Sequence, residues 1–479
     1  MPYLQVSIFI TFLLLPFGLS QAAPNLEELS AELRAAVTQE SLRQHLQAFQ
    51  AIADANGGNR SAGSAGYDAS VAYVQEQLEA AGYTVTLQPF SVDSFAVLGT
   101  ARLEMNAGES VAFQDSTDIM TMNLSIGGEV SAQVQAIDVQ LPLGSGSSTS
   151  GCEASDFDAF TPGNVALLQR GTCTFQVKVD RATAAGASAV IIFNEGRQGR
   201  TEVFGGSLGE VSSIPVLSAS YATGQTLAEG EPDVNLVTNT MTGMRTTHNL
   251  IAETRGTKPD QTVMIGGHLD SVPNGPGIHD NGSGSAAILE IAVQLAQLYE
   301  RDSAAPTLRF AWWGGEELGL LGSRHYVNSL SRTESGQIKA YLNLDMVGSP
   351  NFVRFVYDGD ESDRSTNLPL PEGTAQIEEL FLDYFGDEML STTPIAVFSR
   401  SDHDPFARAG IPVGGLFTGA EGTKSNQAAE RYGGNAGEAF DACYHRACDT
   451  IDNVDFGVLE QMADAAAHAL VTLASRSLW

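Results

Sequence analysis

The sequence predicts an α/β protein in which helices flank a mixed, mostly parallel central sheet and a β-rich module is inserted. Beyond Thr246, short apolar segments alternate with helical segments, which is the pattern of an α/β sheet. Between about Gly127 and Val237, short Val, Ile and Leu runs are separated by Gly and Ser, which is typical of a β-rich module. The 479 residues also exceed one typical domain, so two or three compact units are expected.

The N-terminal segment differs in kind from the rest of the chain. Residues 1–25 carry no charged side chain, and the apolar run at 6–19 is shorter than the roughly 20 residues that cross a bilayer. Ser20 and Ala22 supply the small residues of a cleavage site, although the usual basic residue near the start is missing. We therefore expect a signal peptide at 1–22 and a secreted or periplasmic protein. A buried N-terminal helix is the alternative.

Hydrophobic periodicity predicts the elements that follow. Residues 26–55 are helix-like, and residues 67–81 form an amphipathic helix that Gly82 ends. The remaining expected elements are strands at 250–254, 262–266, 307–313 and 340–347, and helices at 283–299 and 458–474. The expected organisation is one module made from 23–126 and 241–479, interrupted by the β-rich module at 127–240.

The charge balance excludes one class of partner. The chain has 25 basic and 57 acidic side chains, which gives a formal net charge of −32. We therefore expect no nucleic-acid partner, and the same charge would repel anionic membranes once the signal is removed.

Four cysteines in an exported chain predict two disulfides, for which three pairings are possible. Sequence proximity favours Cys152 with Cys173, and Cys443 with Cys448. Free buried thiols are the alternative.

Side chains that suit a metal site follow successive predicted strands, where reactive groups gather in α/β sheets. The motifs are GGHLDS with His268 and Asp270, GIHDNGSG with Asp280, WWGGEELGLLGS with Glu316 and Glu317, and NLDMVG with Asp345. Zinc binds imidazole nitrogen and carboxylate oxygen, and a two-metal site needs one carboxylate that bridges the metals. The motifs contain each of these ligand types.

Each residue of this set has an expected role. His268 would bind one metal, Glu317 the other, and Asp280 both, while Asp270 would orient the His268 ring. Glu316 would stay unligated as the general base that takes a proton from a metal-bound water. Taken singly, Asp280 could cap a helix, the glutamates could complement a helix dipole, and His268 could be a core histidine. Their coincidence at successive strand ends favours the metal site.

These motifs and CYHRACDT resemble those of the co-catalytic zinc aminopeptidases, which include aminopeptidase Y and the secreted bacterial leucine aminopeptidases. The resemblance covers residues 59–90 and 246–470, and the intervening GCEASDF, LLQRGTCTF and AGASAVIIFN resemble a protease-associated domain. It implies two zinc ions, with His268 and Asp345 at one, Glu317 and His445 at the other, and Asp280 between them. It also implies that Tyr444 helps to hold the oxyanion, that Arg400 lies near the amino end of the substrate, and that Phe417 lines the pocket for the first side chain.

The implied activity is hydrolysis of the N-terminal peptide bond of peptides and proteins, with a preference for apolar first residues. The acidic cluster around Glu316 and Asp345 suits a free ammonium group, and no basic cluster that would bind a terminal carboxylate accompanies the motifs. The alternatives are a glutaminyl cyclase-like enzyme or another zinc hydrolase on the same scaffold, and a receptor-like binding protein without activity. Calcium binding, the oligomeric state and the role of the inserted domain stay open.

Two histidines compete for the last ligand position, His403 in SRSDHDPF and His445 in CYHRACDT. A disulfide between Cys443 and Cys448 would clamp the loop of His445 and favours it, because a metal site needs rigid ligands. His403 precedes an apparent helix start, where it would cap the helix or support the site. His279 is left open between support of Asp280 and a structural role. The residues expected to be structural are His45, His248, His325, His468, Trp312 and Trp313.

Overall fold

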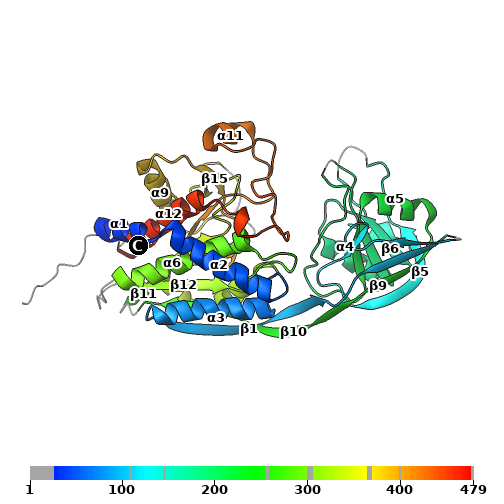
Figure 1. The fold of residues 1–479 in the computed structure, drawn as a ribbon, viewed down its shortest axis with the longest axis horizontal. Coiled ribbons are helices and arrows are strands. Elements are labelled where there is room, and N and C mark those ends of the chain that lie inside the picture. Colours follow the sequence, from blue (N-terminus) through cyan, green and yellow to red (C-terminus); the bar gives the residue numbers. More distant parts are fainter. Residues whose placement is uncertain are drawn as a thin grey trace, which may run out of the picture.

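The computed structural model describes residues 26–475 except 108, 144–146, 198, 255–257, 299–305, 364–368 and 399–400. The predicted signal peptide and Arg400 lie outside the described residues. Two bodies, each built around an eight-stranded sheet, are joined by a long two-stranded ribbon (Figure 1). The ribbon consists of β1 (Thr84–Val97) and β10 (Thr240–Glu253), which pair antiparallel along their whole length.

The first body is an α/β unit whose sheet is parallel at its centre and mixed at its edges. The strand order is β1-β10-β12-β11-β13-β16-β14-β15, and the four strands from β12 to β16 run parallel to one another. The strands besides the ribbon are β11 (Lys258–His268), β12 (Pro306–Trp313), β13 (Ile338–Leu344), β14 (Phe355–Asp358), β15 (Thr393–Ala396) and β16 (Val413–Phe417). The predicted mixed, mostly parallel sheet is confirmed.

Both faces of this sheet are buried, which explains why its strands are almost continuously apolar. Val263 and Ile265 of β11 belong to the core on one face, whereas Met264 between them belongs to the core on the other. Trp312 and Trp313 likewise point to opposite faces and are fully buried. These tryptophans are therefore core residues.

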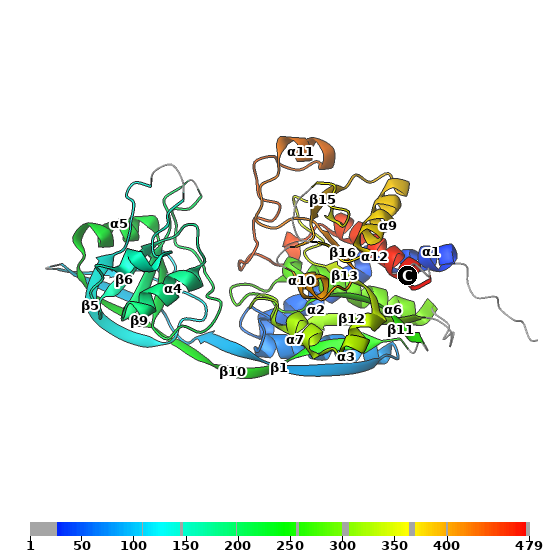
Figure 2. The ribbon, with the colours of Figure 1, turned by 180° about the vertical axis from the view of Figure 1, so that it is seen from behind.

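Helices cover the two faces unequally. The larger layer is α1 (Leu26–Ala36), α2 (Gln39–Ala55), α3 (Ala65–Ala80), α6 (Gly284–Leu298), α9 (Thr374–Asp387) and α12 (Phe456–Ser475). The opposite face holds α7 (Leu321–Ser329) and α10 (His403–Arg408), which lie in front of the sheet in Figure 2. The shorter helices are α8 (Arg332–Gln337) and α11 (Asn426–Tyr432). No described helix has the length and apolar character needed to cross a membrane.

The N-terminal helical stretch differs from the sequence prediction in one respect. It is divided into α1 and α2, because the Thr38 side chain accepts a hydrogen bond from the Ser41 backbone N–H and caps the start of the second helix. The next helix, α3, ends where it was expected, and Gly82 follows it with φ of +92°, a conformation that favours glycine. The predicted strand at 250–254 is the end of the longer β10, since pairing with β1 extends it.

The second body is the inserted module. Its strand order is β3-β2-β9-β5-β6-β7-β8-β4, and Val165 and Leu167 of β6 face one core while Ala166 and Leu168 face the other. Its elements are β2 (Arg102–Ala107), β3 (Glu109–Phe113), β4 (Ile119–Thr121), β5 (Gly128–Ala136), η1 (Ala154–Phe157), β6 (Val165–Gln169), α4 (Phe175–Ala184), β7 (Ala189–Phe193), β8 (Val216–Ala219), α5 (Tyr221–Gly230) and β9 (Asp233–Thr238). Strands β2 to β4 join this sheet although they precede residue 127; the division at 127 and 240 stays a prediction.

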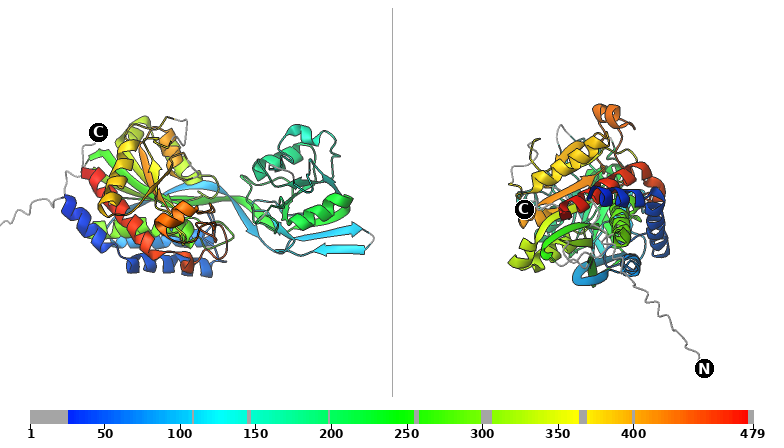
Figure 3. Two further views of the ribbon diagram at one scale, coloured as in Figure 1. Left: turned by 90° about the horizontal axis from the view of Figure 1, so that it is seen from above. Right: turned by 90° about the vertical axis from the view of Figure 1, so that its left-hand side faces the viewer.

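The ribbon sets where the second body sits. Only Leu250 to Glu253 of β10 pair with β12, so the rest of β10 and its partner β1 run beyond the first sheet toward the module (Figure 3). The module is thus attached by two extended strands rather than by a loose linker.

Candidate metal centre

The register of the parallel strands brings the candidate side chains to one edge of the first sheet. Gly266 pairs with Asn343, and Asn343 pairs with Gly415. Two residues further along these strands, His268 and Asp345 therefore lie side by side. His268 also pairs with Trp313, after which the chain turns into the loop that carries Glu316 and Glu317.

Five of the predicted side chains meet at this edge. His268 Nε2 lies 3.3 Å from Asp280 Oδ1 and 3.3 Å from Asp345 Oδ1. His445 Nε2 lies 3.1 Å from Asp280 Oδ2 and 3.1 Å from Glu317 Oε2. Asp280 thus presents one carboxylate oxygen to each histidine and lies between two groups of candidate ligand atoms.

Two residues near the cluster have left-handed backbone conformations, which are uncommon for residues other than glycine. His445 has φ of +58°, and Met346, directly after Asp345, has φ of +50°. Such conformations persist where the surrounding structure enforces them, and they concentrate at functional sites. Around His445 that constraint includes the Cys443–Cys448 disulfide. Cys152 and Cys173 are also bonded, so both pairs that sequence proximity favours are present.

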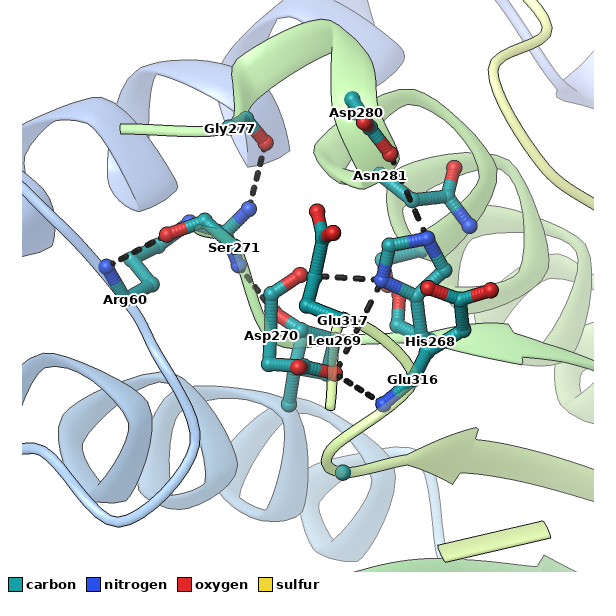
Figure 4. Close-up of polar contacts among 12 residues, drawn as sticks. Arg60, His268, Leu269, Asp270, Ser271, Gly277, Asp280, Asn281, Glu316 and Glu317 are labelled. Carbon is teal, nitrogen blue, oxygen red and sulfur yellow. Dashed lines mark hydrogen bonds and ion pairs between the residues drawn. The ribbon is translucent and has the colours of Figure 1, made fainter. Parts of the chain in front are cut away.

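Asp270 links His268 to the loop of the two glutamates (Figure 4). Its backbone carbonyl lies 3.0 Å from His268 Nδ1, whereas its carboxylate Oδ1 lies 3.7 Å from that nitrogen. The same Oδ1 accepts a hydrogen bond of 3.2 Å from the backbone N–H of Glu316. Asp270 therefore orients His268 through its backbone and the Glu316 loop through its side chain.

Arg60 supports the loop between His268 and Asp280, a role that the sequence did not reveal. Its buried guanidinium donates hydrogen bonds to the backbone carbonyls of Leu269, Pro276 (2.9 Å) and Gly277 (2.5 Å) (Figure 4). Burial lowers the pKa of Arg60 to about 10, and the charge of Asp270 opposes this shift most strongly. In the sequence, an arginine in GGNR looks like a surface residue, because nothing near it marks its distant partners.

A second buried network ties the Asp280 loop to the His445 loop. Asp449 accepts hydrogen bonds from the backbone N–H groups of His279 (2.9 Å) and Asp280 (3.1 Å). Asp441 contacts His279 Nδ1 at 2.7 Å and accepts from the Cys443 backbone N–H at 2.7 Å. His279 therefore joins the two loops. Asp449 stands in the CYHRACDT motif, which was the available signal, but its partners are more than 160 residues away in sequence.

His403 lies outside the cluster. Its Nε2 contacts the Val397 backbone carbonyl, and its ring packs on Tyr357 with centroids 4.4 Å apart. Burial lowers the pKa of His403 to about 4. Its neighbour Ser401 contributes instead, because the Ser401 hydroxyl donates a 2.6 Å hydrogen bond to Asp345 Oδ2.

The electrostatics of the cluster fit a divalent cation. Burial raises the pKa of Glu317 to about 7 and, together with Glu317 and Asp345, raises that of Glu316 well above its usual range. Burial alone would lower the pKa of His268, but the charges of Asp345 and Glu316 outweigh it and raise that pKa. Among the described residues, Glu317 Oε1 is buried without a hydrogen-bond partner. Carboxylates crowded around two imidazoles, with one oxygen unsatisfied, form a donor set that suits zinc.

A pocket opens beside the cluster. His268, Asp280, Glu316, Asp345 and His445 line one side of it. The rest of its lining is mostly apolar or aromatic: Met346, Tyr357, Ile395, Phe417, Ala420 and Tyr444, with Ser401. Tyr444 packs on the His445 ring at a centroid distance of 3.8 Å, and Phe417 is the last residue of β16. The predicted Tyr444 and Phe417 thus reach the same pocket.

The remaining histidines have protein partners away from the cluster. His45 contacts Tyr73 and Glu290, and His468 contacts Ser30. His325 stacks on Phe90, and the backbone carbonyl of His248 accepts from the Tyr67 hydroxyl.

Comparison with known families assigns both bodies of the chain. The model of "Peptidase family M28" matches residues 249–470, and that of the "PA domain" matches residues 134–227. These matches correspond to the α/β body and to the inserted module.

Full-length relatives agree with these matches. An aminopeptidase of Pseudomonas aeruginosa is 46% identical over 428 residues, which cover 88% of this chain and 78% of the relative. A probable lipoprotein aminopeptidase, LpqL, of Mycobacterium tuberculosis is 39% identical over 456 residues, covering 93% of this chain and 87% of the relative. The crystal structure of BSAP, a zinc aminopeptidase from Bacillus subtilis, is 25% identical with a TM-score of 0.70, and covers 92% of this chain and 97% of that one.

Proposed function

The chain belongs to peptidase family M28, and from this premise we propose that it is an aminopeptidase that uses two zinc ions to release single residues from the amino end of peptides. The observation that carries the proposal is the position of Asp280, whose two oxygens face the two histidines His268 and His445 at 3.3 and 3.1 Å. The names of the relatives support the activity, since the curated relatives described above are aminopeptidases.

The proposed ligands divide into two groups that share Asp280. His268 and Asp345 would hold one zinc ion, and Glu317 and His445 the other. Bound zinc would lower the pKa of water and polarise the peptide carbonyl. Asp270, Ser401 and the His279 network hold these ligands in place through the contacts described above.

Glu316 is the proposed general base. It lies in the pocket beside the ligands, and its raised pKa suits a group that takes a proton from the attacking water and later gives it to the leaving amine. Tyr444 lines the same pocket, and its hydroxyl would donate a hydrogen bond to the carbonyl oxygen as negative charge develops there.

The pocket also supports the choice of substrate. The carboxylates of Glu316 and Asp345 suit a free ammonium group, whereas a terminal carboxylate would be repelled. Phe417, Ile395 and Met346 would surround the first side chain, so we expect apolar first residues to be preferred. The role of Arg400 near the amino end stays a prediction.

Export is part of the proposal. Both disulfides suit an oxidising compartment, and the Mycobacterium tuberculosis relative is named a lipoprotein.

A substrate panel with metal analysis tests the proposal. The protein should release p-nitroaniline from leucine p-nitroanilide, lose this activity with a strong chelator, and regain it with zinc. N-acetyl-leucine p-nitroanilide, which lacks the free amine, should not be cleaved. Mass spectrometry under native conditions should find two zinc ions per chain. Cleavage of only the acetylated substrate would refute the aminopeptidase, and a single zinc per active chain would favour a cyclase-like enzyme.

A further inference from the structure

A second pocket reaches the metal centre, and it is lined by different groups. Asp270, Glu317 and His445 border it, whereas the pocket of Phe417 is bordered by His268, Asp280, Glu316 and Asp345. Among the described residues that line the two pockets, His445 borders both. The cluster therefore lies between two separate spaces.

The walls of this second pocket come from both bodies of the molecule. The α/β body and its ribbon contribute Leu318 and, from β1, Phe95 to the lining of this pocket. The inserted module contributes Asn123, Leu124 and Ser207. Phe95 and Leu318 also pack against the hydrophobic core of the module.

The two bodies approach closely at this pocket. A Cβ placed on Gly205 of the module would lie 2.9 Å from Asn274 Nδ2 of the α/β body. Leu318 directly follows the proposed zinc ligand Glu317, so one short loop carries both a ligand and part of the contact with the module.

We propose that this pocket binds the second residue of the peptide, and that the inserted module thereby takes part in substrate selection. The inference rests on the proposed function. If the first side chain enters the Phe417 pocket and the scissile carbonyl lies at the cluster, the part of the peptide after the scissile bond must leave through the other space. The pocket of Phe95, Leu124 and Leu318 is that space.

The lining of the pocket indicates which second residues bind best. Phe95, Leu124 and Leu318 offer apolar surface to a side chain, while Asp93 also borders the pocket and disfavours an acidic one. An apolar second residue should therefore be preferred over glycine by roughly tenfold in kcat/KM, the effect of filling a hydrophobic pocket.

Variants of the residues that line the pocket give a direct test with the full-length zinc enzyme. Ser207→Trp fills the pocket from an exposed position, and Phe95→Ala removes one wall. The controls are Ser110→Trp and Phe113→Ala in β3, which make the same types of change in the inserted module at positions away from the pocket. The substrates are L-leucinamide, which has no second residue, and the tripeptides Leu-Phe-Gly and Leu-Gly-Gly.

The expected results separate this inference from the proposed function. Ser207→Trp should lower kcat/KM for Leu-Phe-Gly by roughly tenfold and change that for L-leucinamide less than about twofold. Phe95→Ala should reduce the preference for Leu-Phe-Gly over Leu-Gly-Gly, and both controls should behave like wild type. Equal effects on L-leucinamide and the tripeptides, or no effect on either, would overturn the inference while leaving the aminopeptidase intact. A wild-type enzyme that releases leucine from none of these substrates would instead refute the proposed function.

Discussion

Glu316 and Glu317 are neighbours in the chain but face different surroundings. The Glu317 carboxylate lies 3.1 Å from His445, within the ligand cluster. Glu316 is anchored by its backbone to Asp270, and its side chain lines the pocket beside the cluster. A single loop can therefore supply both a ligand and a base, since consecutive side chains point in different directions.

Replacing Glu316 tests this division of roles. Glu316→Gln keeps the shape of the side chain but removes the proton acceptor, so kcat should fall by roughly 10² to 10⁴-fold while zinc content stays near wild type. Glu317→Ala is the companion variant, and it should lower zinc content as well as activity. Metal analysis of the purified variants measures both. Loss of zinc from Glu316→Gln would show that Glu316 is itself a ligand.

The two competing histidines are distinguished in the same way. His445→Ala should lose one of the two proposed zinc ions and nearly all activity, because its Nε2 faces Asp280 and Glu317. His403→Ala should keep both ions, since its Nε2 is directed to the Val397 carbonyl. Zinc stoichiometry checks this pair, and the reverse pattern would reject the proposed ligand set. His403→Ala also removes a buried ring, so its thermal stability should fall.

At the scale of elements, the loops between the strands need support from distant parts of the chain. The loop from Leu269 to Gly277 separates the proposed ligands His268 and Asp280, and Arg60 holds both of its ends. The guanidinium donates hydrogen bonds to three backbone carbonyls. Leaving buried carbonyls without hydrogen bonds would cost stability. A rigid loop of this kind keeps the two proposed ligands at a fixed distance and orientation from each other.

Arg60→Met should therefore weaken the metal site as well as the fold. Losing three buried hydrogen bonds should lower the free energy of unfolding by about 3 kcal/mol or more, and zinc should be removed by lower concentrations of chelator. Arg43→Met is the control. Arg60 packs on the Phe49 ring and Arg43 on the Phe456 ring, but Arg43 donates no described hydrogen bond to the loop. Denaturant unfolding and chelator titration measure the two effects. Equal zinc retention in both variants would contradict the role of Arg60 in the site.

At the scale of the whole molecule, the two bodies have separate hydrophobic cores. One pair of cores lies on the two faces of the α/β sheet, and another pair lies on the two faces of the module sheet. The proposed zinc ligands belong to the first body alone. Metal binding should therefore stabilise one body much more than the other.

Calorimetry of the full chain with and without a chelator tests this expectation. A ligand present at 100 times its Kd stabilises the folded state by about 2.7 kcal/mol, so removal of zinc should lower the unfolding temperature of the α/β body by several degrees. The transition of the inserted module should move little. The double variant Cys152→Ala/Cys173→Ala assigns the two transitions, because loss of this disulfide should lower the unfolding temperature of the inserted module only. A chelator that shifts both transitions equally would show that the bodies unfold as one unit.

Much of the fold could be predicted because its signals are local. The strands of the parallel sheet are apolar on both faces, so β11, β12 and β13 stand out in the sequence within a few residues of their observed bounds. No strand was predicted at β1, and only the end of β10 was predicted, because this ribbon forms by pairing between segments more than 140 residues apart in the chain. The break between α1 and α2 was also missed, although the Thr38 cap that causes it is a local signal.

The sequence by itself determined which residue types are available for the proposed chemistry, whereas the tertiary structure decided which of them meet. The types of ligand were readable because His268, Asp280, Glu316, Glu317 and Asp345 stand in short motifs directly after strands. The sequence already favoured His445 over His403 through the predicted disulfide, and packing places His445 in the cluster and turns the His403 ring toward Val397. The roles of Arg60 and Asp441 and the pocket beside Leu318 were not predicted. Their partners lie far away in sequence, and a local sequence pattern does not indicate which distant surface it will pack against.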